Sequence, residues 1–252
     1  RRLNSAHVLK NYTQTRKRNF LYLVTEFVDG QTLTQWMIDN PHPDLEEMRG
    51  IVEQIARGLR AFHRMEMVHQ DLRPENIMID KTGTVKIIDF GSTKVAGVLE
   101  AEPAVDGEDI LGTVQYTAPE YFVGDIGTHR ADFFSLGVIA YQMLTGKLPY
   151  GAQVAKTRTK AQQRKLRYTS ALDANPTVPE WLDGAIKKAV HPDPYKRYEA
   201  LSELVYDFRH PNQIFLSNAH TPLSERNPLL FWKSLCLILL GVILAQLAYF
   251  TT

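Results

Sequence analysis

The feature that most constrains the fold of this chain is a set of polar residues that borders two short apolar runs. His69–Asn76 reads His-Gln-Asp-Leu-Arg-Pro-Glu-Asn and immediately precedes the first run, at residues 77–79. A turn-forming Asp-Lys-Thr-Gly stretch separates it from the second run, at residues 85–88, and both runs have the composition of β-strands. Asp89-Phe90-Gly91 follows directly. The polar residues on both sides of these strands are the candidates for a functional site.

Helices are indicated by capping residues and by apolar spacing. Asp44, with Glu47 three residues later, predicts the start of a long helix that runs to about Phe62. Residues 131–144 are too apolar for a surface helix and are predicted to form a core helix that ends at Gly146. The other predicted elements are a buried strand at Phe20–Val24 and two helices, at Pro179–Val190 and Tyr198–Phe208.

Composition excludes several classes of protein. The chain has 44% hydrophobic and 23% charged residues, which is ordinary for one globular domain with an appendage. Its formal net charge of +1 gives no global field for nucleic acid, and we expect no nucleic-acid partner. The single cysteine, Cys236, rules out an intrachain disulfide. Residues 91–112 lack periodicity and hold five acids, which is typical of a mobile loop.

The C-terminal segment differs in kind from the rest. Residues 229–250 would span about 33 Å as a helix, which matches a bilayer core of about 30 Å. Lys233 is their only charge, and Arg226 also lies on the N-terminal side. We predict a single transmembrane helix that leaves the preceding domain in the cytoplasm. A buried core helix is the alternative, and the proline-containing residues 211–228 are predicted to be a juxtamembrane linker.

Further motifs connect these features to a known family. Gly112–Glu120 reads Gly-Thr-Val-Gln-Tyr-Thr-Ala-Pro-Glu, and Asp132–Val138 and Arg197 follow it. Together with His69–Asn76 and Asp89-Phe90-Gly91, these resemble, in order, the landmarks of eukaryotic-type protein serine/threonine kinases. The resemblance covers about residues 8–208. Details of the motifs, with the apolar C-terminal segment, also resemble bacterial fusions of a metal-dependent protein phosphatase with a kinase.

The resemblance implies an α+β, kinase-like fold that consists mainly of the helical C-lobe and the last strands of the N-lobe. The implied domains are an N-lobe remnant and hinge at 1–29, the C-lobe at 30–210, the linker at 211–228 and the membrane helix at 229–250. The family's Gly-rich phosphate loop, strand lysine and partner glutamate would precede Arg1. We therefore expect a truncated chain with weak or no catalysis of its own, and an active parent protein. The resemblance to the bacterial fusions implies that this parent carries an N-terminal phosphatase domain.

The resemblance also assigns catalytic roles. Asp71 would accept the proton of the attacking hydroxyl, and Arg73 would neutralise the transferring phosphoryl group. Asn76 and Asp89 would hold Mg²⁺ through one amide oxygen and one carboxylate. Thr113 would touch the catalytic aspartate and mark a serine/threonine kinase. Taken singly, Asp71, Asn76 or Asp89 would more often cap a turn than take part in catalysis.

The nucleotide site is likewise implied by the resemblance. The adenine of ATP would lie against the segment that follows the Phe20–Val24 strand. Backbone groups of Glu26 and Val28 would bond the ring, Thr25 would guard the rear of the pocket, and Met78 would pack below it. An ordinary strand threonine is an equally good reading of Thr25.

Four other residues receive predictions. The resemblance implies a structural ion pair between Glu120 and Arg197 and core packing for His69 and Phe90. Gln70 stands where many relatives have an arginine that pairs with a phosphorylated loop, and a neutral amide cannot make that contact. We therefore expect activity not to depend on phosphate in residues 91–112.

Three functions stay open at the level of sequence. The first is a membrane-anchored serine/threonine kinase that acts on protein substrates with ATP and Mg²⁺. The second is a pseudokinase that serves as a binding scaffold; intact Asp71, Asn76 and Asp89 speak against it. The third is a small-molecule phosphotransferase, which the Gly112–Glu120 motif disfavours.

Overall fold

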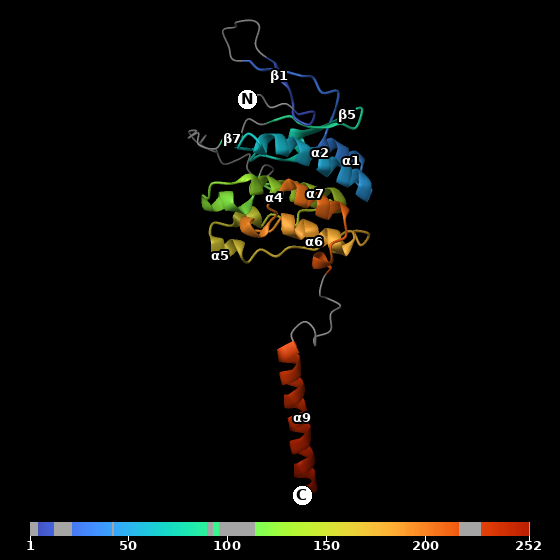
Figure 1. Cartoon of the computed structure of the whole chain (residues 1–252), viewed down its shortest axis with the longest axis vertical. Coiled ribbons are helices and arrows are strands. Elements are labelled where there is room, and N and C mark those ends of the chain that lie inside the picture. The colour runs from blue at the N-terminus through green and yellow to red at the C-terminus, as the bar shows by residue number, and fades with distance from the viewer. Residues whose placement is uncertain are drawn as a thin grey trace. The chain divides into compact units, whose positions relative to one another are not determined.

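The structure is a computed structural model that describes residues 5–12, 22–41, 43–89, 93–95, 114–216 and 228–251. The chain divides into two compact units, residues 1–215 and residues 216–252, and each is treated by itself. In the first unit, strands lie at one end and helices α2, α4, α7 and α6 follow in layers (Figure 1).

The strands of the first unit form three small antiparallel sheets. The largest has the order β3-β5-β6 and pairs Gly30 with Asp80 and Ile77 with Ile87. At Gly30 the backbone runs so close to the carbonyl of Ile79 that an added Cβ would overlap it, so only glycine fits. The strands are β1 (Asn11–Tyr12) with β2 (Val24–Thr25), β3 (Gly30–Thr32) with β5 (Ile77–Asp80) and β6 (Val85–Ile87), and β4 (Met67–Val68) with β7 (Lys94–Val95).

Two predicted helices form the centre of the core. In α2 (Leu45–His63), Asp44 and Glu47 make the reciprocal hydrogen bonds of a capping box, as predicted. Helix α4 (His129–Thr145) is buried along nearly its whole length and ends at Gly146, whose φ of 66° is left-handed. The predicted core helix is therefore confirmed, because no face of α4 is left to solvent.

The remaining elements of the first unit complete this helical part. Helix α6 begins after Pro179 and ends before Val190, as predicted. The other helices are α1 (Leu33–Asp39), α5 (Lys160–Gln163), α6 (Glu180–Ala189) and α7 (Leu201–Arg209), and the 3-10 turns are η1 (Pro74–Asn76), η2 (Pro119–Val123), η3 (Val154–Lys156), η4 (Ala171–Asp173), η5 (Pro194–Lys196) and η6 (Gln213–Phe215).

Two sequence predictions were wrong in part. The helix predicted from Tyr198 begins only at Leu201, because Arg197 adopts an extended conformation and Ala200 is the residue before the helix. The strand predicted at 20–24 was expected to be buried, yet Leu23 and Val24 at its described end are 68% and 38% exposed. Among the described residues, β2 pairs only with β1, so it forms a ribbon rather than part of a larger sheet.

The second unit contains α9 (Pro228–Thr251), so the predicted helicity of residues 229–250 is confirmed. No helix in the described part of the chain combines the length and the apolar character needed to cross a membrane. The transmembrane prediction for this segment therefore has no support from the structure. Of the other predicted regions, residues 217–227 of the linker and most of the loop at 91–112 lie outside the described residues.

Candidate active site

Asp132, a buried aspartate of α4, holds the loop that carries Asp71. Asp132 is 0% exposed. Its carboxylate accepts hydrogen bonds from the backbone N–H of His69 at 3.1 Å, the backbone N–H of Gln70 at 3.1 Å and Nε2 of His63 at 2.8 Å. Gln70 has a φ of 69°, a left-handed conformation that costs free energy for a residue with a side chain. Asp132 therefore holds the start of the loop in a shape that it would not adopt alone.

His69 is a packing residue, as predicted. Its ring is fully buried and meets Phe62 edge-on, with 5.4 Å between the ring centroids. Burial lowers the pKa of His69, although the nearby carboxylates of Asp132, Asp71 and Asp89 oppose that shift. The backbone N–H of Ile88 donates to the carbonyl of Asn76 at 2.9 Å, so Asp89 follows a residue that is paired with Asn76.

Asp71 and Asn76 are joined directly. Nδ2 of Asn76 donates to the backbone carbonyl of Asp71 and to its carboxylate Oδ2, each at 2.9 Å. The amide nitrogen is thereby committed to Asp71, so the amide oxygen is the end that can meet a cation. Asn76 closes η1, whose first residue is Pro74, and that turn holds the amide in place.

Burial and nearby charged groups together determine the pKa of Asp71. Burial raises the pKa of Asp71, whereas Arg73 and the hydrogen bond from Asn76 lower it, and the charge of Asp89 raises it further. The net pKa lies above that of an ordinary aspartate. Nε of Arg73 donates to Glu75 at 2.8 Å, which fixes the guanidinium beside the loop. These contacts thus join Asp71 directly to Asn76, with Arg73 in the same loop, and Asp89 lies one residue beyond the backbone pairing of Ile88 with Asn76.

The donor set fits Mg²⁺. One carboxylate, at Asp89, and one amide oxygen, at Asn76, are the hard oxygen ligands that this ion takes, with water and phosphate completing the octahedron. In the part of the chain that the structure describes, no three His, Cys, Asp or Glu side chains group as a metal site. A site that depends on substrate phosphates for most of its ligands agrees with that finding.

The residues predicted to bind the nucleotide lie on or near strands β2 and β5. The backbone N–H of Glu26 donates to the carbonyl of Lys10 at 3.0 Å, which leaves the carbonyl of Glu26 as its backbone group for a ligand. Its carboxylate accepts from the N–H of Lys10 at 2.9 Å and from Nζ of Lys86 at 2.8 Å. Burial alone would raise the pKa of Glu26, but these bonds outweigh it and lower the pKa.

The other predicted nucleotide residues differ in exposure. Val28 is buried, Met78 on β5 is half-buried and Thr25 on β2 is exposed. An exposed Thr25 favours the reading as an ordinary strand residue. Thr113, Phe90 and Gly91 lie outside the described residues.

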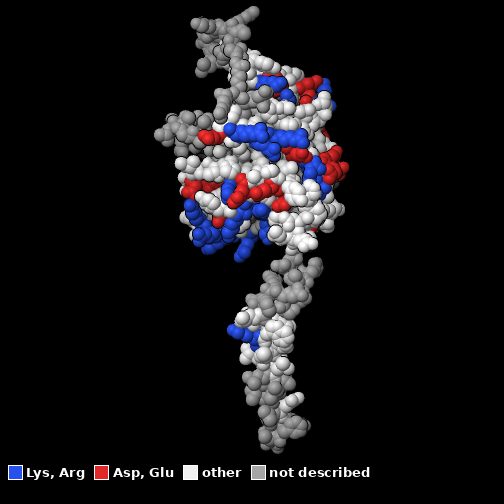
Figure 2. Space-filling view, viewed as in Figure 1, with Lys and Arg blue, Asp and Glu red and all other residues white. Residues whose placement is uncertain are grey.

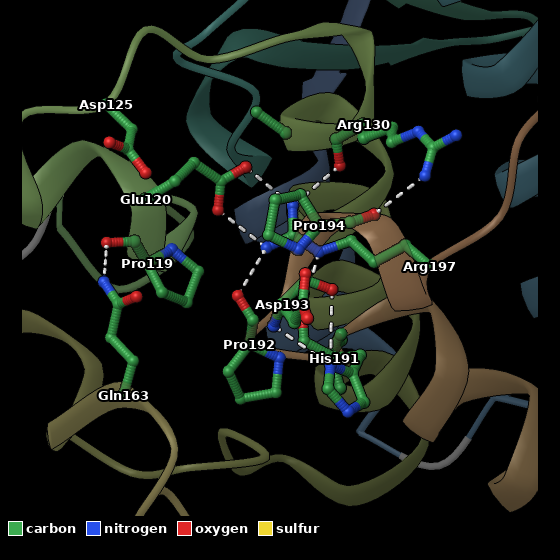
Figure 3. A network of polar contacts seen from close by, with 12 residues as sticks. Pro119, Glu120, Asp125, Arg130, Gln163, His191, Pro192, Asp193, Pro194 and Arg197 are labelled. Atoms are coloured by element: carbon green, nitrogen blue, oxygen red, sulfur yellow. Dashed lines mark hydrogen bonds and ion pairs between the residues drawn. The ribbon is translucent and has the colours of Figure 1, made fainter. Parts of the chain in front are cut away.

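The predicted ion pair between Glu120 and Arg197 is confirmed. The two guanidinium Nη atoms donate to the two carboxylate oxygens at 2.8 and 2.7 Å, and both side chains are buried (Figure 3). Arg197 also donates to the backbone carbonyls of His191 at 2.7 Å and of Arg130 at 2.9 Å. The pair therefore ties η2, α4 and the segment before α7 to one another.

Sequence reasoning missed two parts of this support. Asp132 was placed within a matching motif but was given no role; the available signal was an acid inside an otherwise apolar helix, which needs buried partners. Tyr116 was also missed. Its hydroxyl donates to Gln142 at 2.6 Å, its carbonyl accepts from Ser135 at 2.8 Å, and burial raises its pKa to about 12.

Comparison with known families agrees with this geometry. The sequence profile of the family described as the protein kinase domain matches residues 1–208. This chain belongs to that family, and the kinase-like α+β fold expected from the motifs is thereby supported.

Bacterial relatives are similar over most of the chain. Serine/threonine-protein kinase PrkC of Bacillus subtilis is 30% identical over 207 residues, which are 82% of this chain and 31% of the relative. "Probable serine/threonine-protein kinase PknB" of Lactococcus lactis is 32% identical over 187 residues, 74% of this chain and 29% of the relative. Serine/threonine-protein kinase PknA of Mycobacterium tuberculosis is 37% identical over 136 residues, 54% and 31%. The chain spans about a third of the length of these relatives.

Proposed function

We propose that this chain is the catalytic part of a protein serine/threonine kinase, which transfers the γ-phosphoryl group of ATP to hydroxyl groups of protein substrates. The observation that carries the proposal is the pair of hydrogen bonds from Asn76 to Asp71, at the end of a loop anchored by Asp132. Asp89 follows Ile88, whose backbone N–H donates to the carbonyl of Asn76. The names of the bacterial relatives support the serine/threonine class.

Each residue has a defined task in this proposal. Asp71 accepts the proton of the attacking hydroxyl at its carboxylate, and the hydrogen bond from Asn76 keeps that carboxylate oriented. Arg73 offsets negative charge on the transferring group. Asn76 and Asp89 would hold Mg²⁺, which supplies countercharge for the phosphate oxygens when bound. Thr113 and the backbone of Glu26 and Val28 keep their predicted roles toward the acceptor and the adenine.

The independence from loop phosphorylation is part of the proposal. Asp132 already fixes the backbone of Gln70, and Gln70 offers no cation to a phosphate. Replacing the serine and threonine residues of 91–112 by alanine should leave phosphoryl transfer within about threefold. Complete loss of transfer in a folded variant would contradict this.

The remaining sequence predictions concern the parent protein and its attachment to a membrane. Truncation ahead of Arg1, an N-terminal phosphatase domain, and membrane attachment through residues 229–250 with a cytoplasmic kinase domain all stay predictions. Fractionation of cells that express the chain with and without residues 229–250 tests the membrane prediction, because only an anchored chain stays with membranes after alkaline washing.

A radiolabel-transfer assay separates the functions that stay open. The longer parent protein expected from the sequence is supplied with γ-labelled ATP, Mg²⁺ and either generic protein acceptors or a panel of small alcohols. Label on protein Ser or Thr that is lost in Asp71→Asn and in Asp89→Ala supports the proposal. Nucleotide binding without transfer to any acceptor indicates a scaffold, and label on small alcohols alone indicates a small-molecule phosphotransferase; either outcome contradicts the proposal.

A further inference from the structure

A strongly basic surface lies outside the residues used so far. Residues 133–172 contain no Asp or Glu. Within them, the segment through η3 and α5 carries six exposed cations, which we call the basic surface: Lys156, Arg158, Lys160, Arg164, Lys165 and Arg167. In Figure 2, the part of the first unit where Figure 1 labels α5 is mostly blue. The small formal net charge of the whole chain, +1, hides this local excess.

The segment that carries the basic surface is anchored to the core by buried side chains, while its cationic side chains are exposed. Val154, Thr157 and Gln163 are buried at 3%, 4% and 8% exposure, and Leu166 packs against the core. The side-chain amide of Gln163 donates to the carbonyl of Pro119, at the start of η2 (Figure 3). The basic surface is thus attached to the segment that runs from Tyr116 into Glu120.

Most of these cations lack a partner of opposite charge. Lys160 pairs with Asp125 at 2.9 Å, and the guanidinium of Arg158 donates to the backbone carbonyls of Ala155 and Thr157. Among the residues that the structure describes, no carboxylate lies within ion-pair distance of the others: Lys156, Arg164, Lys165 and Arg167. Leaving like charges together costs free energy that a partner of opposite charge would recover.

Two hollows border the basic surface. One has a volume of about 370 Å³; Lys156, Lys165 and Arg167 line it together with Gln153, Thr157, Gln162 and Leu166, and no acid is among its lining residues. The second, of about 510 Å³, lies between α5 and the segment before α7. Arg164 and Lys196 line it with exposed Tyr195, and its three acids are already engaged: Glu120 with Arg197, Asp125 with Lys160, and Asp193 with the N–H of Tyr195.

We infer that the basic surface docks an acidic segment of the protein substrate, so that this kinase prefers acceptors that carry a run of Glu or Asp away from the phosphorylated hydroxyl. The identity of the docked segment as part of a substrate rests on the proposed kinase function. Hollows on both sides of α5 can receive side chains of a polypeptide, whereas a bilayer presents a broad surface without projections that fit them. The hydrogen bond from Gln163 to Pro119 joins the basic surface to the start of η2.

Binding is tested first, without any need for catalysis. Two labelled peptides share one threonine acceptor, and one has a tail of about six Glu where the other has Gln; tails are placed on either side of the acceptor. With the Asp71→Asn chain at low salt, fluorescence anisotropy should show about tenfold tighter binding of the Glu peptide in one placement. High salt should remove the difference, since exposed charges are screened.

A matched pair of variants assigns the effect to the surface. Lys156→Gln/Lys165→Gln/Arg167→Gln should bring the Glu peptide down to the affinity of the Gln peptide. Arg57→Gln/Arg60→Gln/Arg64→Gln removes the same charge from exposed positions on and just after α2 and should keep the preference. Equal affinity of both peptides for the unaltered chain, or equal loss in both triple variants, would overturn the inference.

Kinetics and vesicles complete the test. In phosphoryl transfer, the acidic tail should lower KM with little change in kcat, because docking affects binding of the substrate and not the reacting groups. If no peptide is phosphorylated, the proposed function fails while the anisotropy result still decides the docking site. Binding of phosphatidylglycerol vesicles that the first triple variant abolishes, without any gain from the Glu tail, would assign the surface to lipid and overturn the inference.

Discussion

The two sides of the candidate active site are held in different ways. We call the part of the site around Asp71 the acceptor side. There, buried Asp132 accepts three hydrogen bonds, and Asn76 donates a hydrogen bond to the carboxylate of Asp71. On the nucleotide side, β2 pairs with β1 in a two-stranded ribbon, and Phe27, which follows β2, is 88% exposed. The polar contacts that hold this ribbon include those of Glu26 with Lys10 and Lys86.

This difference shows where the helical core contributes to function. Catalysis of phosphoryl transfer depends on groups that are already oriented before the substrate binds. The buried bonds of the acceptor side supply such orientation. Leu23, Val24 and Phe27 on the nucleotide side are exposed, so we predict that this segment opens at a lower free-energy cost than the acceptor side.

The largest expected effect comes from removing the support of the acceptor side. Asp132→Ala leaves two buried N–H groups and His63 without their acceptor, and should lower the free energy of unfolding by about 3–5 kcal/mol. Urea denaturation measures this, and the exposed Asp125→Ala serves as control with a loss below about 1 kcal/mol. A loss for Asp132→Ala as small as that of the control would remove the contrast between the two sides.

The next effect separates chemistry from support. Asp71→Asn keeps the shape of the side chain but removes the base, and should lower kcat by about 10²–10⁴-fold. The free energy of unfolding should change by less than about 1 kcal/mol, because Asn76 can still donate to the new amide oxygen. Steady-state transfer assays and urea denaturation on the same preparation check both; unchanged kcat would rule out Asp71 as the base.

The pH dependence should reflect the raised pKa of Asp71. The base works only when ionised, so kcat/KM should fall as pH decreases through a pKa that lies above the ordinary aspartate range. Arg73→Gln removes a cation that lowers this pKa, so the acidic limb should move to higher pH. The exposed Arg64→Gln should leave the limb in place. A pH profile of kcat/KM for the three proteins measures this, and a shift to lower pH contradicts the assignment.

The smallest effect on stability is expected on the nucleotide side. Phe27→Ser removes a side chain that is 88% exposed, so the free energy of unfolding should change by less than about 0.5 kcal/mol. Nucleotide titration of the same variant shows whether this ring contacts the ligand. A loss above about 2 kcal/mol would mean that the ribbon is packed as firmly as the acceptor side.

Local signals in the sequence predicted the parts of the fold that short-range contacts decide. The capping box of Asp44 and Glu47 and the left-handed Gly146 are set by residues within one helical turn, and both were predicted. The partners of Asp132 lie more than sixty residues away along the chain, so no local pattern could name them. The pairing of Glu120 with Arg197 was predicted only through the family resemblance.

Errors arose where a distant contact overrides a local preference. The apolar spacing from Tyr198 favours a helix, yet Arg197, which is in the buried pair with Glu120, and Ala200 both have extended backbone conformations, and the helix begins only at Leu201. Helix α1 was not predicted, although Thr32 caps it by accepting the N–H of Gln35. The predicted buried strand before Glu26 is exposed because burial depends on elements that cover it, which apolar composition alone does not specify.

Gly30 gives the two sides of the site a common hinge point. Its backbone lies against Ile79 of the β-hairpin whose ends carry Asn76 and Asp89, and it follows the ribbon along the chain. Any side chain there would push β3 away from β5 and so change the position of the segment before β3 relative to Asn76 and Asp89. In the proposed function, this spacing separates the adenine of ATP from its phosphates, so the missing side chain at Gly30 would set the distance over which the nucleotide must fit.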